Sequence, residues 1–168
     1  MEQTRDGAGR ASAREEFAAA VTEHSHGMFR AARSILDSDA DAEDAVGEAV
    51  LRAWQSWDRL RARGAVRAWL LKIAVNCAYE QRRKTGRVDC TDQLEAPAPF
   101  PNLDARCDLW TALTRLPRDQ RAVVVLFYYE DMTEEQIASL LAVLRGTVKS
   151  RLSRAREHLR RLLREEET

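Results

Sequence analysis

The sequence is poor in cysteine, histidine, glycine and proline, and it lacks the patterns by which cysteine and histidine form disulfide bonds or metal sites. Its three cysteines, Cys77, Cys90 and Cys107, have spacings that match neither a disulfide framework nor a four-cysteine zinc site. The three histidines lack zinc-ligand spacing to these cysteines, and no glycine-rich phosphate loop is present, so we expect no metal and no other cofactor. Seven glycines and four prolines among 168 residues are few, whereas leucine, alanine, arginine and glutamate abound, which favours an all-α fold.

Long apolar runs and a net charge are lacking as well. No segment reaches the ~18 consecutive apolar residues that a membrane span needs, and residues 1–14 lack the apolar core of a signal peptide. We therefore expect a cytoplasmic protein without membrane insertion. The 27 basic residues balance 27 acidic ones, which argues against a uniformly basic nucleic-acid coat and against an acidic disordered chain.

The charges are unevenly placed along the chain. Residues 37–48 contain six acids and no base, whereas residues 59–87 contain nine bases and one acid, and residues 143–164 contain eight bases and one acid. One acidic and two basic patches indicate different partners at different sites, and patches this basic fit a polyanion. Solvated helix faces are the plain alternative for such charge runs.

Helical spacing of apolar residues marks a first block after an expected mobile tail, residues 1–14. Three stripes predict helices over residues 15–36, 39–57 and 66–83. Ser38 or Asp39 is expected to cap the second helix, and Gly27 to break the first. We expect the core to hold Trp54, Trp57, Trp69 and Cys77.

A linker and a second block follow. Residues 88–107 hold three prolines and no periodic stripe, which predicts an extended linker. In residues 108–164, the apolar run 123–129 has strand propensity, but it has no partner strand and we interpret it as a buried helix. Thr133 with Gln136 has capping-box spacing and opens a helix over residues 134–141. We thus predict two small helical domains joined by an extended linker.

The last two predicted helices, residues 134–141 and 146–163, fit a helix-turn-helix. In this motif the second helix enters the major groove of DNA. An apolar stripe would fix this helix to its domain, and the opposite face carries donors for bases and phosphates: Lys149, Ser150, Ser153 and Arg154. A helical hairpin with a solvated basic face is the alternative.

Six stretches resemble one family, the extracytoplasmic-function sigma factors of RNA polymerase. Similarity to region 4 of this family is carried by residues 116–117, 120–123, 132–138 and 146–156. Residues 41–54 resemble region 2.2, and residues 67–76 resemble regions 2.3 and 2.4. The resemblance covers residues 17–163 and implies region 2 over residues 15–87 and region 4 over residues 108–164.

The resemblance also implies a function without catalysis. Such proteins bind core RNA polymerase through the β′ clamp helices and the β flap, recognise −10 and −35 promoter elements and help to open promoter DNA. An anti-sigma factor is an optional further partner. Residues 124–128 are expected to form core, with part facing the β flap.

Residue roles carry over where the motifs match. The polymerase contacts implied on the acidic helix are Glu43, Asp44, Glu48 and Arg52. The residues implied at the −10 element are Leu60, Arg61, Arg63, Lys72 and Asn76. Those implied at the −35 element are Arg145, Thr147, Lys149, Ser150, Arg151, Ser153 and Arg154.

Two departures from the family pattern stand out. Gly47 occupies a position where the family usually has glutamine, and the turn over residues 141–144 lacks a glycine. Two other functions therefore stay open. One is a helix-turn-helix regulator that binds DNA without core polymerase, and the other is an interaction protein that occupies polymerase or an anti-sigma partner without promoter activity.

Overall fold

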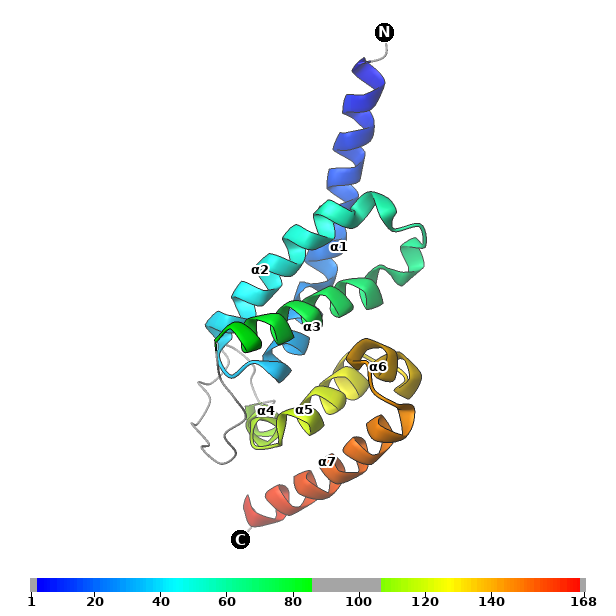
Figure 1. The fold of residues 1–168 in the computed structure, drawn as a ribbon. Helices are drawn as coiled ribbons and strands as arrows, with labels where there is room; N and C mark the ends of the chain where they lie inside the picture. Colours follow the sequence, from blue (N-terminus) through cyan, green and yellow to red (C-terminus); the bar gives the residue numbers. More distant parts are fainter. Residues whose placement is uncertain (1–2, 86–106, 167–168) are drawn as a thin grey trace.

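The computed structural model describes residues 3–85 and 107–166, in which every regular element is helical. Two helical bundles lie side by side, one formed by α1–α3 and the other by α4–α7 (Figure 1). The prediction of an all-α fold with two small helical domains is confirmed. Among the helices of these residues, none has the length and apolarity to span a membrane.

The first bundle packs α1 (Gln3–Ile35), α2 (Asp39–Ser56) and α3 (Val66–Lys84) against one another. Ser38 caps α2 as predicted, because its side chain accepts a hydrogen bond of 3.1 Å from the Asp41 backbone N–H. The buried face of α2 consists of small residues, which allow the helix to approach its neighbours closely: Ala42, Ala45, Ala49 and Ala53.

Two short 3-10 turns connect α2 to α3, namely η1 (Trp57–Arg59) and η2 (Arg63–Ala65). The segment between the two predicted helices, residues 58–65, therefore contains short helical turns near both of its ends. Trp57 anchors the first turn, since its side chain is buried and its ring lies 5.1 Å from that of Phe17 and 6.1 Å from that of Trp69.

Two expectations for α1 were wrong. The helix begins at Gln3, so residues 3–14 are helical, not a mobile tail; this segment is rich in alanine and arginine, which are strong helix formers. The helix also continues through Gly27, because glycine lowers helix stability by only ~1 kcal/mol and the surrounding contacts outweigh this cost.

The tryptophan predictions hold only in part. Trp57 is buried and Trp69 is half-buried, but 41% of the Trp54 surface is exposed. Trp54 still contacts the core through the ring of Phe17, at a centroid distance of 5.1 Å. Trp54 lies at the edge of the apolar stripe of α2. A residue at the edge of such a stripe contacts the core on one side and solvent on the other, which explains the partial exposure of Trp54.

The second bundle comprises α4 (Cys107–Thr114), α5 (Arg118–Val124), the π-helix η3 (Val125–Tyr129), α6 (Glu134–Leu141) and α7 (Arg145–Glu166). Residues 123–129 are helical as predicted, and residues 123–126 are buried. The predicted linker, apart from its last residue, lies outside the described residues.

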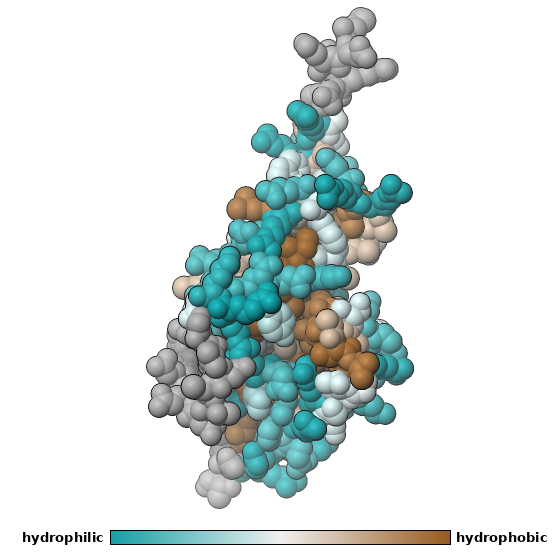
Figure 2. Space-filling view, viewed as in Figure 1, coloured by the Kyte–Doolittle hydropathy of each residue, from teal (hydrophilic) through white to brown (hydrophobic). Residues whose placement is uncertain are grey.

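The two bundles share an interface in which α1 packs against α5 and η3. Asp37 pairs with Arg118 across it. Arg121 is buried close to this pair, and burial lowers the pKa of its guanidinium to about 10, against the opposing effect of Asp37. On the face shown in Figure 2, hydrophobic residues gather around α3 and α6 within a largely hydrophilic surface. Buried hydrophobic residues of both bundles belong to one core cluster, so the bundles meet through apolar and charged contacts together.

Candidate nucleic-acid and polymerase interface

The helix-turn-helix is formed by α6, a turn and α7. Thr133 and Gln136 form the predicted capping box, with backbone-to-side-chain hydrogen bonds of 3.2 and 2.8 Å in the two directions. The glycine-free turn is made by Ala142, whose φ of 55° and ψ of 44° lie in the left-handed region. An alanine thus ends α6 in the backbone conformation that glycine usually supplies at this position.

The first turns of α7 present the predicted −35 residues to solvent. Val148, Leu152 and Ala155 are buried and fix the helix to its domain. Lys149, Ser153 and Arg154 are exposed, and Thr147, Ser150 and Arg151 are half-buried. Within the described residues, neither Lys149 nor Arg154 has an ion-pair partner, so both cations are open to an external anion.

Two other basic residues of this face already contact acids. Arg145 lies 3.2 Å from Glu134 and 2.8 Å from Glu135, and Arg151 lies 3.5 Å from Asp119. The Arg145 pairs are exposed and therefore weak, but they reduce the local positive charge at the start of α7. The centre of the basic face is Lys149 with Arg154.

The predicted −10 residues fall into two groups. Lys72 and Asn76 are exposed, one turn apart on α3. In the loop before α3, Arg61 and Arg63 are exposed and Leu60 is half-buried. The Arg63 guanidinium stacks over the Trp57 ring at 4.2 Å from the centroid, a cation–π contact that orders this loop.

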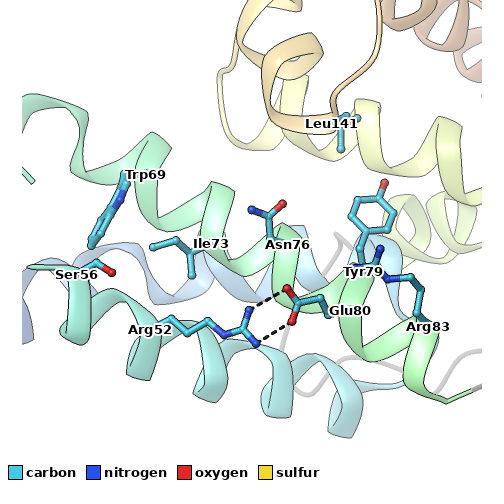
Figure 3. A pocket seen from close by; sticks show the side chains of 9 residues that line it. All are labelled: Arg52, Ser56, Trp69, Ile73, Asn76, Tyr79, Glu80, Arg83 and Leu141. Carbon is cyan, nitrogen blue, oxygen red and sulfur yellow. Dashed lines mark hydrogen bonds and ion pairs between the residues drawn. The ribbon is translucent and has the colours of Figure 1, made fainter. Parts of the chain in front are cut away.

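A pocket of about 570 Å³ lies beside Asn76. Its lining combines one amide, aromatic faces and charged groups, and comes from α2, α3 and α6: Arg52, Ser56, Trp69, Ile73, Asn76, Tyr79, Glu80, Arg83 and Leu141. Figure 3 shows Asn76 projecting from α3 toward the side on which α6 places Leu141. The second bundle therefore overhangs this pocket.

The predicted polymerase residues lie on the outer face of α2. Glu43, Asp44 and Glu48 are exposed, and Arg52 lies between two carboxylates, Glu48 at 2.8 Å and Glu80 at 2.7 Å. The hydrogen bonds from Arg52 lower the pKa of Glu80, and both carboxylates raise the pKa of Arg52. The Arg52–Glu80 contact therefore favours the charged form of both partners.

One exposed residue of this face, Leu51, is not among the residues predicted from the sequence. Leu51 is 61% exposed and lies three residues after Glu48, on the acidic side of α2. Its position outside the apolar stripe is the signal that could have revealed it. A large exposed apolar side chain within an acidic face is typical of protein–protein contact surfaces.

Potential metal-ligating and thiol side chains also occur elsewhere in the first bundle. Glu23 and His26 stand three residues apart, a spacing used by carboxylate-bridged metal sites. Within residues 3–85 and 107–166, no group of three or more metal-ligating side chains is gathered at one place. Cys77 is buried as predicted, and this burial raises the pKa of its thiol above the usual value for cysteine.

Comparisons with known proteins match both bundles. The family model described as sigma-70 region 2 matches residues 20–88, and the model described as sigma-70 region 4 matches residues 108–159. The chain is 37% identical over 153 residues to the extracytoplasmic-function sigma factor SigL of Mycobacterium tuberculosis, covering 85% of this chain and 86% of the relative. The chain belongs to the extracytoplasmic-function sigma factor family. It is therefore a transcription initiation factor, with region 2 in the first bundle and region 4 in the second.

Further relatives agree with this assignment. The chain is 35% identical over 144 residues to the sigma factor SigM of the same organism, covering 83% of this chain and 73% of the relative. Among solved structures, it is similar to the sigma factor RpoE from Bartonella quintana in complex with the anti-sigma factor NepR. That match has a TM-score of 0.71 and 30% identity, and covers 89% of this chain and 98% of RpoE.

A second structural neighbour is CnrH in complex with the cytosolic domain of CnrY. Its TM-score is 0.63 at 27% identity, and the match covers 92% of this chain and 94% of CnrH. Both structural matches extend over the two regions, so the fold of the whole described chain is that of this family.

Proposed function

We propose that this sigma factor carries three contact surfaces, one for core polymerase and two for promoter DNA. The observation that carries the proposal is the separation of charge by face. An acidic face lies on α2, whereas exposed cations and an amide lie on α3 and at the start of α7. Acidic and basic surfaces select different partners, because like charges repel the wrong one.

The start of α7 is the −35 surface in this proposal. Lys149, Ser153 and Arg154 reach base edges or the nearest phosphates, and Thr147 and Ser150 support them from half-buried positions. Arg145 and Arg151 contact phosphates after exchanging their carboxylate partners for DNA. Charge-assisted bonds to phosphate are stronger than exposed ion pairs within the chain, which favours the exchange.

The −10 surface combines Lys72 and Asn76 with the loop residues Leu60, Arg61 and Arg63. A base that leaves the stack can be bound in a pocket by an amide and an aromatic face. Asn76 offers both a donor and an acceptor for such a base. Trp69 in the same pocket supplies an aromatic surface.

The acidic face of α2 contacts the β′ clamp helices through Glu43, Asp44, Glu48 and Arg52. The exposed Leu51 adds an apolar contact. In region 4, Tyr128 is the exposed part of the run 124–128 and is our candidate for contact with the β flap. The protein acts in the cytoplasm and catalyses no reaction of its own. Because the solved neighbour RpoE is bound to an anti-sigma factor, such a factor is a further candidate partner.

Run-off transcription with sigma-free core polymerase tests this proposal. The wild-type chain should yield specific transcripts from a promoter pool, and Lys149→Ala and Asn76→Ala should each reduce them about tenfold or more, the loss expected for a base contact. Matched controls are Arg160→Ala, an exposed arginine further along α7, and Thr22→Ala, an exposed polar residue on α1. DNA binding without core binding would instead establish an ordinary regulator, and core binding without transcripts an interaction protein.

A further inference from the structure

Glu130 is a buried carboxylate at the contact between regions 2 and 4. It directly follows η3 in region 4, and only 1% of its surface is exposed. Arg30 of region 2 donates to its Oε1 at 2.7 Å, and Arg67 of region 2 donates to its Oε2 at 3.0 Å. Among the described residues, Glu130 is the single buried carboxylate, and both partners that satisfy its charge come from the other region.

The backbone of region 4 is irregular where it positions this side chain. The π-helix η3 ends at Tyr129, and the Glu130 N–H bonds to the carbonyl of Val125, five residues earlier, at 3.2 Å. The next residue, Asp131, has a φ of 50°, in the left-handed region. Single π-turns of this kind occur frequently at functional sites.

Region 2 is adapted to the same carboxylate by a missing side chain. A Cβ atom at Gly27 would lie 2.6 Å from Oε2 of Glu130 and 3.2 Å from its Cδ. No side chain fits at this position while Glu130 remains in place. Gly27 therefore serves a tertiary contact, which explains a glycine in the middle of α1.

The packed form is incompatible with simultaneous reading of both promoter elements. By their names the elements lie roughly 25 base pairs apart, which is about 85 Å along B-DNA at 3.4 Å per base pair. A compact chain of this length has a radius of gyration of about 15 Å. In addition, Leu141 of region 4 lines the pocket that contains Asn76. The regions must separate before both surfaces can reach promoter DNA.

We infer that Glu130, Arg30, Arg67 and Gly27 form an interdomain clasp that holds the sigma factor in a closed form unable to bind a promoter. This inference rests on the proposed −10 and −35 surfaces. Both arginines are partly exposed, with 33% and 41% of their side-chain surfaces accessible, so water can replace Glu130 when the clasp opens. A buried charge pair of this kind fixes a geometry without adding much net stability, as a reversible contact requires.

Two variants open the clasp from opposite sides. Glu130→Gln removes the charge from region 4, and Gly27→Ala inserts a methyl group from region 2. The matched controls are Glu157→Gln, an exposed carboxylate of region 4, and Gly9→Ala, a glycine of α1 whose added Cβ meets no atom within 4 Å. Circular dichroism verifies that all four variants keep their helical content.

Small-angle scattering on the free chain provides the first readout. Both clasp variants should increase the radius of gyration by roughly 3 Å or more, toward the size of two separated domains, whereas both controls should match the wild type. The second readout is transcription with core polymerase at limiting sigma concentration. If one wild-type molecule in ten is open, full opening raises the apparent affinity for the promoter complex about tenfold.

The outcomes separate the inference from the proposed function. Unchanged scattering of both clasp variants would overturn the clasp. Expansion without a gain in transcription, while the wild type transcribes, would overturn its inhibitory role. If no chain supports transcription, the proposed function fails together with the inhibitory role, whereas the scattering result still decides whether Glu130 holds the two regions together.

Discussion

Glu80 on α3 accepts two hydrogen bonds, of 3.0 and 2.7 Å, from the guanidinium of Arg52 on α2. The same guanidinium reaches Glu48 one turn earlier on its own helix. Arg52 is thereby held at the edge of the acidic α2 face, with its charge more than compensated. About a third of each side chain of the Arg52–Glu80 pair is exposed, so solvent screening limits its contribution to stability to ~1 kcal/mol at most.

The variant Glu80→Gln tests whether Glu80 positions Arg52 for contact with polymerase or only stabilises the fold. We expect core-polymerase affinity to fall about fivefold, because Arg52 loses its bidentate partner, while the free energy of unfolding falls by at most ~1 kcal/mol. Arg52 lowers the pKa of Glu80. The contribution of Glu80 to stability is therefore complete above the pKa that Glu80 has in the unfolded chain. It is lost as the pH falls through the pKa that Glu80 has in the folded chain. The stability difference between variant and wild type, measured by urea denaturation, should therefore shrink in acid. Unchanged core affinity would exclude the positioning role, and Glu157→Gln controls for the charge change.

Arg154→Ala tests whether the start of α7 contacts phosphates. A lost phosphate contact weakens binding to all duplexes alike and reduces the slope of log affinity against log salt by about 0.9. A lost base contact instead reduces discrimination at one position of the site. Titrations of labelled −35 duplexes at several salt concentrations distinguish the two. Arg160→Ala should leave both the slope and the discrimination unchanged, and equal behaviour of the two variants would contradict the assignment.

Local signals in the sequence were sufficient to predict most of the helices. The Ser38 cap, the Thr133 capping box and the 3–4 spacing along α7 each depend on residues within one or two turns, so they can be read without the tertiary structure. The charge patterns likewise indicated which faces would be exposed. These local features lie within the two segments that the family models match.

The contacts between the regions could not be predicted in this way. Arg30 and Glu130 are 100 residues apart, and nothing near either residue indicates the other. Gly27 resembled a helix break because its real constraint, a carboxylate from region 4, lies outside its own segment. Trp54 was placed in the core for a related reason, since the edge of a stripe is defined only by the helices that cover it.

Gly47 is the departure from the family pattern that a substitution can reverse. It lies exposed on α2, and an added Cβ meets no atom within 4 Å. Gly47→Ala should stabilise the chain by ~1 kcal/mol through helix propensity alone. Gly47→Gln should stabilise it similarly and also raise core affinity, if the residue faces polymerase. Calorimetry with core polymerase decides this, and equal affinities of the alanine and glutamine variants would show that position 47 makes no side-chain contact.

Substitution of Ala142 tests how much stability the glycine-free turn of the helix-turn-helix costs. Its left-handed backbone costs an alanine ~1–2 kcal/mol, and glycine avoids this cost while losing ~0.4–1 kcal/mol through greater freedom of the unfolded chain. Ala142→Gly should therefore raise the free energy of unfolding by ~0.5–1 kcal/mol, measured by urea denaturation. Ser139→Gly, at an exposed position within α6, should lower it by ~0.5 kcal/mol. Backbone strain at Ala142 is the reason to expect opposite effects from the two glycine substitutions. If both substitutions destabilise the chain, the contacts of Ala142 contribute more to stability than its backbone strain costs.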